Sequence, residues 1–151
     1  MKIRGFEKLN EAGIIPTRAT INSAGYDFYV PEDIVIKANS KIGIKTYICA
    51  YMQPDEYLAI HIRSSISIKK GLELVNQTGI VDSDYYHNPE NLGHIIIWVK
   101  NTNDTDVELK RGDRIAQGIF NKYLKADLDE AKDVRVGGFG STTKEKQVGK
   151  I

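Results

Sequence analysis

Alternation between apolar and polar residues is the dominant pattern along the chain. It has a period of two and recurs in segments rich in Ile, Val and Tyr: DIVIKA (33–38), KIGIKTYICAYM (41–52), EYLAIHI (56–62), LELV (72–75), GHIIIWVKN (93–101) and VELK (107–110). Polar turn sequences such as QPDE, NTNDTD and KRGD separate these segments. The period is typical of β-strands, and many short strands with polar turns favour a β-sandwich, jelly roll or barrel. Among the rest, only ADLDEAK (126–132) is expected to form one or two helical turns.

The segment RVGGFGSTT (135–143) interrupts this pattern with three glycines around Phe139, followed by hydroxyl groups and a lysine. A glycine-rich loop that binds phosphate normally opens a helix. The residues that follow, TKEKQVGKI, are charged and have no apolar stripe, so a phosphate loop of that kind is not expected. We therefore predict one folded domain over residues 1–134 and a flexible C-terminal arm over residues 135–151 that carries the glycine-rich segment.

Composition and charge exclude several classes of function. The 151 residues are 41% hydrophobic and 27% charged, as in a soluble globular domain, and the net charge of +1 favours neither nucleic acid nor an anionic membrane as a partner. The single cysteine, Cys49, excludes an intrachain disulfide and a cysteine-rich zinc site, and its apolar setting predicts a buried, inert thiol. The charged start of the chain and the short apolar run IIIWV predict a cytoplasmic protein (host cytoplasm, if the chain is viral).

Five segments contain polar or glycine residues that a β-sandwich does not need. They are SAGYDFYVP (23–31), HIRSSIS (61–67), NQTGIVDSDYY (76–86), GDRIAQGIF (112–120) and RVGGFGSTT. Each has a structural explanation when taken singly: Asp27 can accept hydrogen bonds in a turn, Arg63 can form a surface ion pair, and Gln117 can bind backbone groups. The pattern as a whole is more informative than any member of it.

Taken together and in this order, AGYDFY, RSS, NQTGIVDSDY, GDRIAQ and GGFGST resemble the five ordered motifs of the trimeric deoxyuridine triphosphate nucleotidohydrolases, or dUTPases. The resemblance implies an all-β jelly-roll-like sandwich or distorted barrel and a homotrimer with active sites shared between subunits. It also implies Mg²⁺-dependent hydrolysis of dUTP to dUMP and pyrophosphate. Two features depart from the family pattern: Arg135 lies one position nearer to the glycine pair than usual, and YHNPENL (86–92) lengthens the hairpin expected around motif three.

The resemblance also implies roles for single residues. Asp82 is the expected base that activates water, and Asp27 lies near Mg²⁺ and acts on it through water. For Asp84 two roles stay open: support by a hydrogen bond or ion pair, and direct chemistry. Donors to the triphosphate are expected from Arg63, Ser64, Ser65 and Gln117. The uracil is expected to bind the motif-three backbone around Gly79 and Val81, helped by the amide of Asn76, while Tyr85 lies against the deoxyribose. In the arm, Phe139 is expected to stack on uracil, Gly140 to let the chain fold closely, and Ser141, Thr142 and Arg135 to meet the terminal phosphate.

Two other functions stay open. A dCTP deaminase shares this fold but uses a catalytic glutamate on the strand after the hairpin, where HIIIWVKN has no carboxylate. A phage-type dUTPase can have an additional regulatory role, for which the tip YYHNPENL is a plausible surface for a protein partner.

Overall fold

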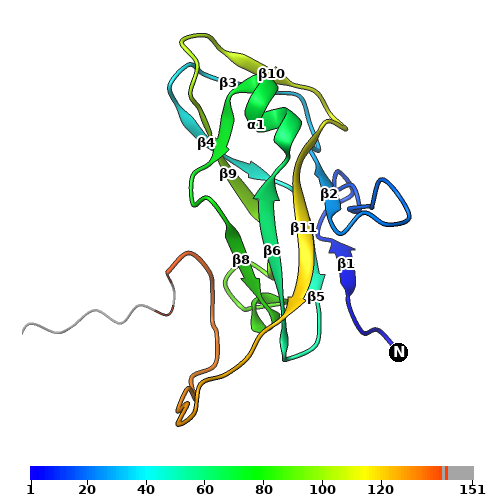
Figure 1. Cartoon of the computed structure of the whole chain (residues 1–151), viewed down its shortest axis with the longest axis vertical. Helices are drawn as coiled ribbons and strands as arrows, with labels where there is room; N and C mark the ends of the chain where they lie inside the picture. The colour runs from blue at the N-terminus through cyan, green and yellow to red at the C-terminus, as the bar shows by residue number, and fades with distance from the viewer. Residues whose placement is uncertain (141, 143–151) are drawn as a thin grey trace, which may run out of the picture.

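The computed structural model describes residues 1–140 and 142, and its architecture is nearly all β. A four-stranded antiparallel sheet forms one side, with the order β2 (Tyr26–Tyr29), β11 (Arg114–Lys122), β6 (Glu56–Ile62) and β8 (Gly79–Asp82). A second, three-stranded sheet contains β4 (Lys41–Lys45), β9 (Ile96–Asn101) and β7 (Leu72–Leu74). Figure 1 shows β11, β6 and β8 side by side along the long axis, with β4 and β9 on another side of the core.

Two short antiparallel pairs complete the sandwich. One joins β1 (Gly5–Lys8) to β5 (Ile48–Tyr51), and the other joins β3 (Ile34–Ile36) to β10 (Val107–Leu109). Apolar side chains from both sheets and both pairs meet in a single core, whose fully covered members include Phe28, Leu58, Val99, Leu109 and Ile115. The predicted jelly-roll-like β-sandwich is confirmed. Buried and exposed residues alternate along β9, which explains why the period-two pattern of the sequence predicts a strand there.

The long apolar run 41–52 forms two strands rather than one. β4 pairs with β9, whereas β5 pairs with β1, so the chain changes sheets between them. The change occurs at Tyr47, whose φ of 57° lies in the left-handed region. The hydroxyl of buried Thr46 donates to the carbonyl of Ile95, 2.5 Å away, and so keeps the turn attached to the start of β9.

Helical structure does not lie where the sequence predicted it. Residues 126–132 are exposed and contain only a turn, so the expected helix is absent: a short segment without a packed apolar face has nothing to offset the cost of helix nucleation. A helix instead follows β6 directly, as α1 (Ser64–Lys70), and ends at Gly71 in the left-handed conformation. Ile66 is its buried anchor. No helix in the described part of the chain is long and apolar enough to cross a membrane.

The segment predicted as a hairpin, NQTGIVDSDYY, instead connects two sheets. Within the described residues, β7 pairs with β9 and β8 pairs with β6, so β7 and β8 are not ladder partners. β8 is followed by the 3-10 turn η1 (Ser83–Tyr85) and by the loop 86–92. Asp82 therefore lies at the end of an edge strand of the four-stranded sheet, where its side chain can reach solvent.

Cys49 is buried, as predicted, and its thiol contacts the carbonyl of its strand partner Glu7 at 3.8 Å. Burial raises the pKa of this thiol to about 11. A thiol that stays protonated at neutral pH is a poor nucleophile, so Cys49 contributes packing rather than chemistry.

Asn101 connects the end of β9 to β3. It is fully buried, and its amide donates to the carbonyls of Ile36 and Thr105, both at 2.9 Å, while its Oδ1 accepts from the backbone N–H of Asn103 at 2.9 Å. An apolar replacement leaves these backbone groups without partners in a place that water does not reach.

We predict that Asn101→Ala lowers the free energy of unfolding by about 2–4 kcal/mol, because several buried polar groups lose their partners together. Urea unfolding followed by circular dichroism measures the change. Lys100→Ala, an exposed neighbour on the same strand, is the control and is expected to change stability by less than about 0.5 kcal/mol. Equal stability of the two variants contradicts this account of Asn101.

Candidate active site

A pocket of about 250 Å³ opens between the edge strand β8, the first residues of β9 and the C-terminal arm. Its walls combine aliphatic side chains with a few polar groups, as small-molecule sites do. Seven of the residues predicted from the sequence line it: Asn76, Gly79, Val81, Asp82, Tyr85, Arg135 and Phe139. The pocket therefore brings motif three and motif five together within one chain.

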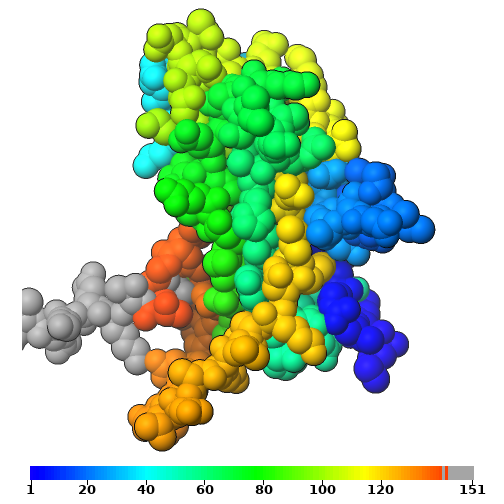
Figure 2. Space-filling model, in the orientation of Figure 1, coloured from blue at the N-terminus to red at the C-terminus, as the bar shows by residue number. Residues whose placement is uncertain are grey.

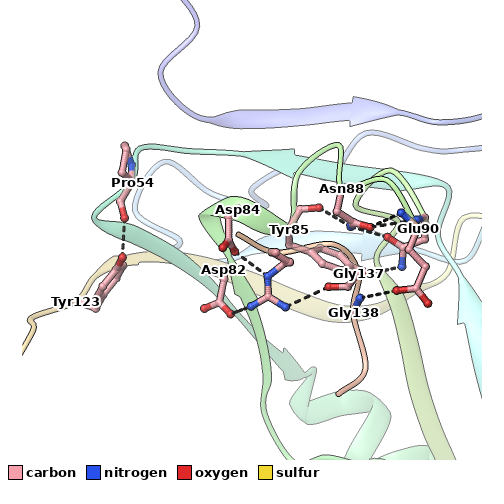
Figure 3. Close-up of polar contacts among 11 residues, drawn as sticks. Pro54, Asp82, Asp84, Tyr85, Asn88, Glu90, Tyr123, Gly137 and Gly138 are labelled. Carbon is pink, nitrogen blue, oxygen red and sulfur yellow. Dashed lines mark hydrogen bonds and ion pairs between the residues drawn. The ribbon is translucent and has the colours of Figure 1, made fainter. Parts of the chain in front are cut away.

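Arg135 binds two carboxylates at the rim of this pocket. Its Nη2 lies 2.6 Å from Asp82 Oδ2, its Nε lies 2.7 Å from Asp84 Oδ1, and its Nη1 donates to the carbonyl of Gly137 at 3.2 Å (Figure 3). The Arg135 side chain is only 17% exposed, whereas those of Asp82 and Asp84 are 49% and 56% exposed. The guanidinium thus pairs with both carboxylates and offsets one of their two negative charges, while each stays partly open to solvent. Asp84, for which the sequence leaves a supporting contact and direct chemistry open, is paired here with Arg135.

Tyr85 lines the pocket, and its hydroxyl forms two hydrogen bonds. It donates to the carbonyl of His94 at 2.6 Å and accepts from the amide of Asn91 at 2.9 Å. Burial raises the pKa of Tyr85, so the phenol stays protonated and its ring is fixed in place. His94 has a structural role too: its Nε2 accepts from the backbone N–H of Tyr47 at 3.0 Å, and burial lowers its pKa.

Phe139 lines the pocket from the arm and is 69% exposed, so its ring is available to a ligand. Its φ of 48° is left-handed, and Gly140 follows with a φ of 87°. Figure 2 shows the described part of the arm, in orange-red, on the left of the view against the green part of the sandwich. Gly140 and Thr142 are exposed and are not among the residues that line the pocket, and the predicted phosphate ligand Ser141 lies outside the described residues.

The remaining predicted residues gather in a second cluster, away from the pocket. Buried Asp27 on β2 is 3.1 Å from Arg63 and 3.4 Å from Arg114, and Gln117 on β11 is its direct register partner. A Cβ at Gly25 would lie 2.5 Å from Gln117 Oε1, so the glycine of AGYDFY leaves room for this amide. Ser64 and Ser65, the first residues of α1, follow Arg63 directly. Motifs one, two and four thus form one polar cluster.

Sheet register sets the separation of the two clusters. Asp27 is level with Gln117 on β11 and with His61 on β6. Asp82 is level with Tyr57, four residues before His61 on β6, and its strand β8 is three strands across from β2. Strand geometry converts these offsets to about 13 Å along the strands and about 14 Å across them, or roughly 15–20 Å in all. Within one chain, Asp27 and Asp82 therefore belong to two separate clusters.

Sequence reasoning missed the contribution of Glu90 and Trp98 to this region. Trp98 on β9 lines the pocket, although its position in an apolar run predicted only core packing. Glu90, in the loop 86–92, contacts the arm through both its backbone and its carboxylate. The lengthened loop was noticed in the sequence, but nothing local identified the segment that it contacts.

One group of three possible metal ligands occurs in the described part of the chain, and it lies outside the pocket: Glu7, Cys49 and His87. Its hydrogen bonds already account for it, since Glu7 accepts from Lys2 at 2.8 Å and from the Tyr86 hydroxyl at 2.9 Å. Mixed sulfur, nitrogen and oxygen donors are also unsuited to Mg²⁺, which prefers oxygen. This group is not a candidate for the expected magnesium ion.

Comparison with known proteins identifies relatives of this chain in sequence and in fold. The dUTPase family profile matches residues 11–143. A deoxyuridine 5′-triphosphate nucleotidohydrolase of Lactococcus lactis is 47% identical over 148 residues, covering 94% of this chain and 99% of that protein. The crystal structure of a Streptococcus mutans dUTPase superposes with a TM-score of 0.76 at 42% identity, covering 82% of this chain and 98% of that one.

A dUTPase of Staphylococcus bacteriophage 80alpha shares the fold at 21% identity, with a TM-score of 0.72 over 95% of this chain and 100% of that one. The profile match extends across all five motif segments, and the structures with dUTPase names share the same β-sandwich. The chain belongs to the dUTPase family.

Proposed function

We propose that this chain is a cytoplasmic homotrimeric enzyme that hydrolyses dUTP to dUMP and pyrophosphate. The observation that supports this most directly is the pocket, where the motif-three residues, an aromatic side chain from the arm and a half-exposed carboxylate surround one space. Residues 1–134 serve as the folded domain, and residues 135–151 serve as the arm that covers the nucleotide.

The base-binding part of the proposal rests on Asn76, the β8 backbone and Phe139. An amide can both donate and accept, which matches the edge of a uracil ring. The exposed ring of Phe139 provides a stacking surface. The fixed ring of Tyr85 lies against the sugar and leaves no room for a 2′-hydroxyl.

Hydrolysis needs a water aimed at the α-phosphorus and a base to accept its proton. Asp82 serves as that base, since its carboxylate is half exposed beside the pocket. In the free chain Arg135 occupies Oδ2 of Asp82 at 2.6 Å, so this oxygen is open to an attacking water only after the arginine moves. A terminal phosphate offers Arg135 an equally strong bidentate partner, and its transfer there frees Asp82 when substrate binds.

The cluster around Asp27 serves the triphosphate. Arg63, Ser64, Ser65 and Gln117 supply donors for phosphate oxygens, and Asp27 supplies a carboxylate. Both Asp27 oxygens face a guanidinium, Arg63 at 3.1 Å and Arg114 at 3.4 Å, so Asp27 would hold Mg²⁺ through water. This suits an ion that keeps several waters and is held largely by substrate phosphates. When bound, the ion supplies neutralisation of phosphate charge.

The separation of Asp27 from Asp82 supports a shared active site. A site that uses both carboxylates has to take them from different copies of the chain. Closed symmetric assembly, the usual form of protein oligomers, provides such pairs repeatedly, and a trimer creates three equivalent sites.

Incubation of the purified chain with Mg²⁺ and each of dUTP, dCTP, dTTP and UTP tests the activity. We expect dUTP to give dUMP and pyrophosphate, with kcat/KM for the other three lower by about 10²-fold or more, because a pocket built to hydrogen-bond one base leaves polar groups unpaired with another. Chromatography of the bases and a pyrophosphate assay report the products. Conversion of dCTP to a uracil product would assign the chain to the deaminases instead.

Asp82→Asn is expected to lower kcat by about 10²- to 10⁴-fold while nucleotide binding persists, because the substitution keeps the shape and removes the proton acceptor. Asp84→Asn is the matched control, since it also removes one carboxylate from Arg135. It is expected to lose less than about tenfold. Steady-state kinetics and calorimetry with a non-hydrolysable analogue separate turnover from binding. The assignment of the base fails if Asp82→Asn turns over normally or if both variants lose activity equally.

Light scattering is expected to give three times the 17.0 kDa chain mass.

The shared site is tested by mixing two inactive variants, Asp82→Asn and Asp27→Asn, and refolding them together. A site is active when one subunit supplies an intact Asp82 and another subunit supplies an intact Asp27. In randomly mixed trimers about a quarter of the sites meet this condition, so about a quarter of the wild-type activity is expected to return. A mixture no more active than its two components, or an active monomer, contradicts the proposal.

A further inference from the structure

The loop 86–92 is a compact structure built around Asn88. This side chain is buried, and its amide donates to the carbonyl of Tyr85 and to Asn91 Oδ1, both at 2.7 Å. Its own Oδ1 accepts from the backbone N–H groups of Glu90 and Asn91, both at 3.1 Å. These bonds fix the backbone of Glu90 next to Tyr85, so that the exposed carboxylate of Glu90 is presented at a defined place.

The arm binds Glu90 with two hydrogen bonds. The backbone N–H of Glu90 donates to the carbonyl of Val136 at 3.1 Å, and the backbone N–H of Gly138 donates to Glu90 Oε2 at 3.2 Å (Figure 3). Together they span Val136 to Gly138, directly between Arg135 and Phe139. Glu90 thus contacts the arm between Arg135, which binds the carboxylates, and Phe139, which lines the pocket.

Both glycines of this stretch are required by these contacts. A Cβ at Gly137 would lie 1.4 Å from Glu90 Oε2, and a Cβ at Gly138 would lie 2.7 Å from the ring of Tyr85. Gly137 is buried although the residues on either side of it in the arm are not. The φ of Gly137 is not positive, so the reason for glycine at this position is the space that the Glu90 carboxylate takes.

We infer that Glu90 is a positioning residue that holds the arm over the base pocket. The inference rests on the proposed function and assigns different roles to the two attachments of the arm. The attachment through Arg135 has to open when the triphosphate takes the guanidinium. The attachment through Glu90 involves no group that the substrate needs, so it persists and keeps Phe139 at the pocket while Arg135 moves.

The first test uses the free protein and needs no activity. Glu90→Ala removes the acceptor of the Gly138 N–H, so hydrogen exchange at Gly138 is expected to rise by about 3- to 10-fold, the range of one net hydrogen bond. Glu90→Gln keeps an oxygen acceptor and is expected to restore most of the protection. Glu108→Ala removes an equal charge from an exposed position on β10, away from the arm, and is the matched control.

The second test is kinetic. Glu90→Ala is expected to raise KM for dUTP by about 3- to 10-fold and to change kcat less, because the bound nucleotide has to order an arm that the wild type holds in place. Gly137→Ala displaces the Glu90 carboxylate and is expected to give a similar rise. The double variant is expected to be no worse than either single one, since both remove the same contact.

The outcomes separate this inference from the proposed function. A wild-type chain without dUTPase activity overturns the function, and the exchange measurement still decides whether Glu90 holds the arm. An active wild type with unchanged Gly138 exchange and unchanged KM in Glu90→Ala overturns the role of Glu90. Additive effects in the double variant also overturn it. The melting temperatures of Glu90→Ala and Glu90→Gln, both at an exposed position, verify that each variant is folded.

Discussion

The antiparallel register of β2, β11, β6 and β8 is the constraint on which the site depends. It places Asp27, on the outer strand β2, opposite Gln117, and Asp82 at the end of the other outer strand, β8. A ladder cannot slip by one residue without moving every core side chain to the wrong face, so packing of Phe28 and Leu58 also fixes the two carboxylates. The positions of the two carboxylates therefore follow from the same packing that makes the sandwich stable.

The arm is held much less strongly than the strands of the sheet. Its contacts are a few polar bonds at the surface, each worth little against water. Arg135 is the exception, because it is mostly covered and binds two carboxylates at once. Elements that move during function come from the weakly held part of a fold, and the arm belongs to that part while the loop that receives it is well bonded internally.

Strand periodicity predicted much of the fold, and the places where it failed have identifiable causes. EYLAIHI forms β6 and the last six residues of GHIIIWVKN form β9, because one face of each strand packs on the core. The break at Tyr47 was not visible, since it follows from a change of sheet partner rather than from a turn residue. The helix α1 was missed because SSISIKK alternates like a strand and buries a single isoleucine.

Site prediction met a similar limit. The motifs identified seven of the residues that line the pocket, since their chemistry is local and ordered along the chain. Glu90 could not be identified, because its partners are 46 to 48 positions away and are backbone groups with no characteristic side chain. The division of the motifs into two clusters was equally invisible to local patterns, because it depends on strand order and register.

The exposed connection between β11 and the arm has a further consequence. Tyr123 is anchored to the carbonyl of Pro54 at 2.7 Å, and residues 124–134 then run through solvent to Arg135. This exposed connection keeps the arm tethered close to the pocket, and a short tether corresponds to an effective concentration of about millimolar. Closure is then a unimolecular event that does not depend on how dilute the protein is, and a free peptide with the arm's sequence has to reach millimolar concentration to compete with it.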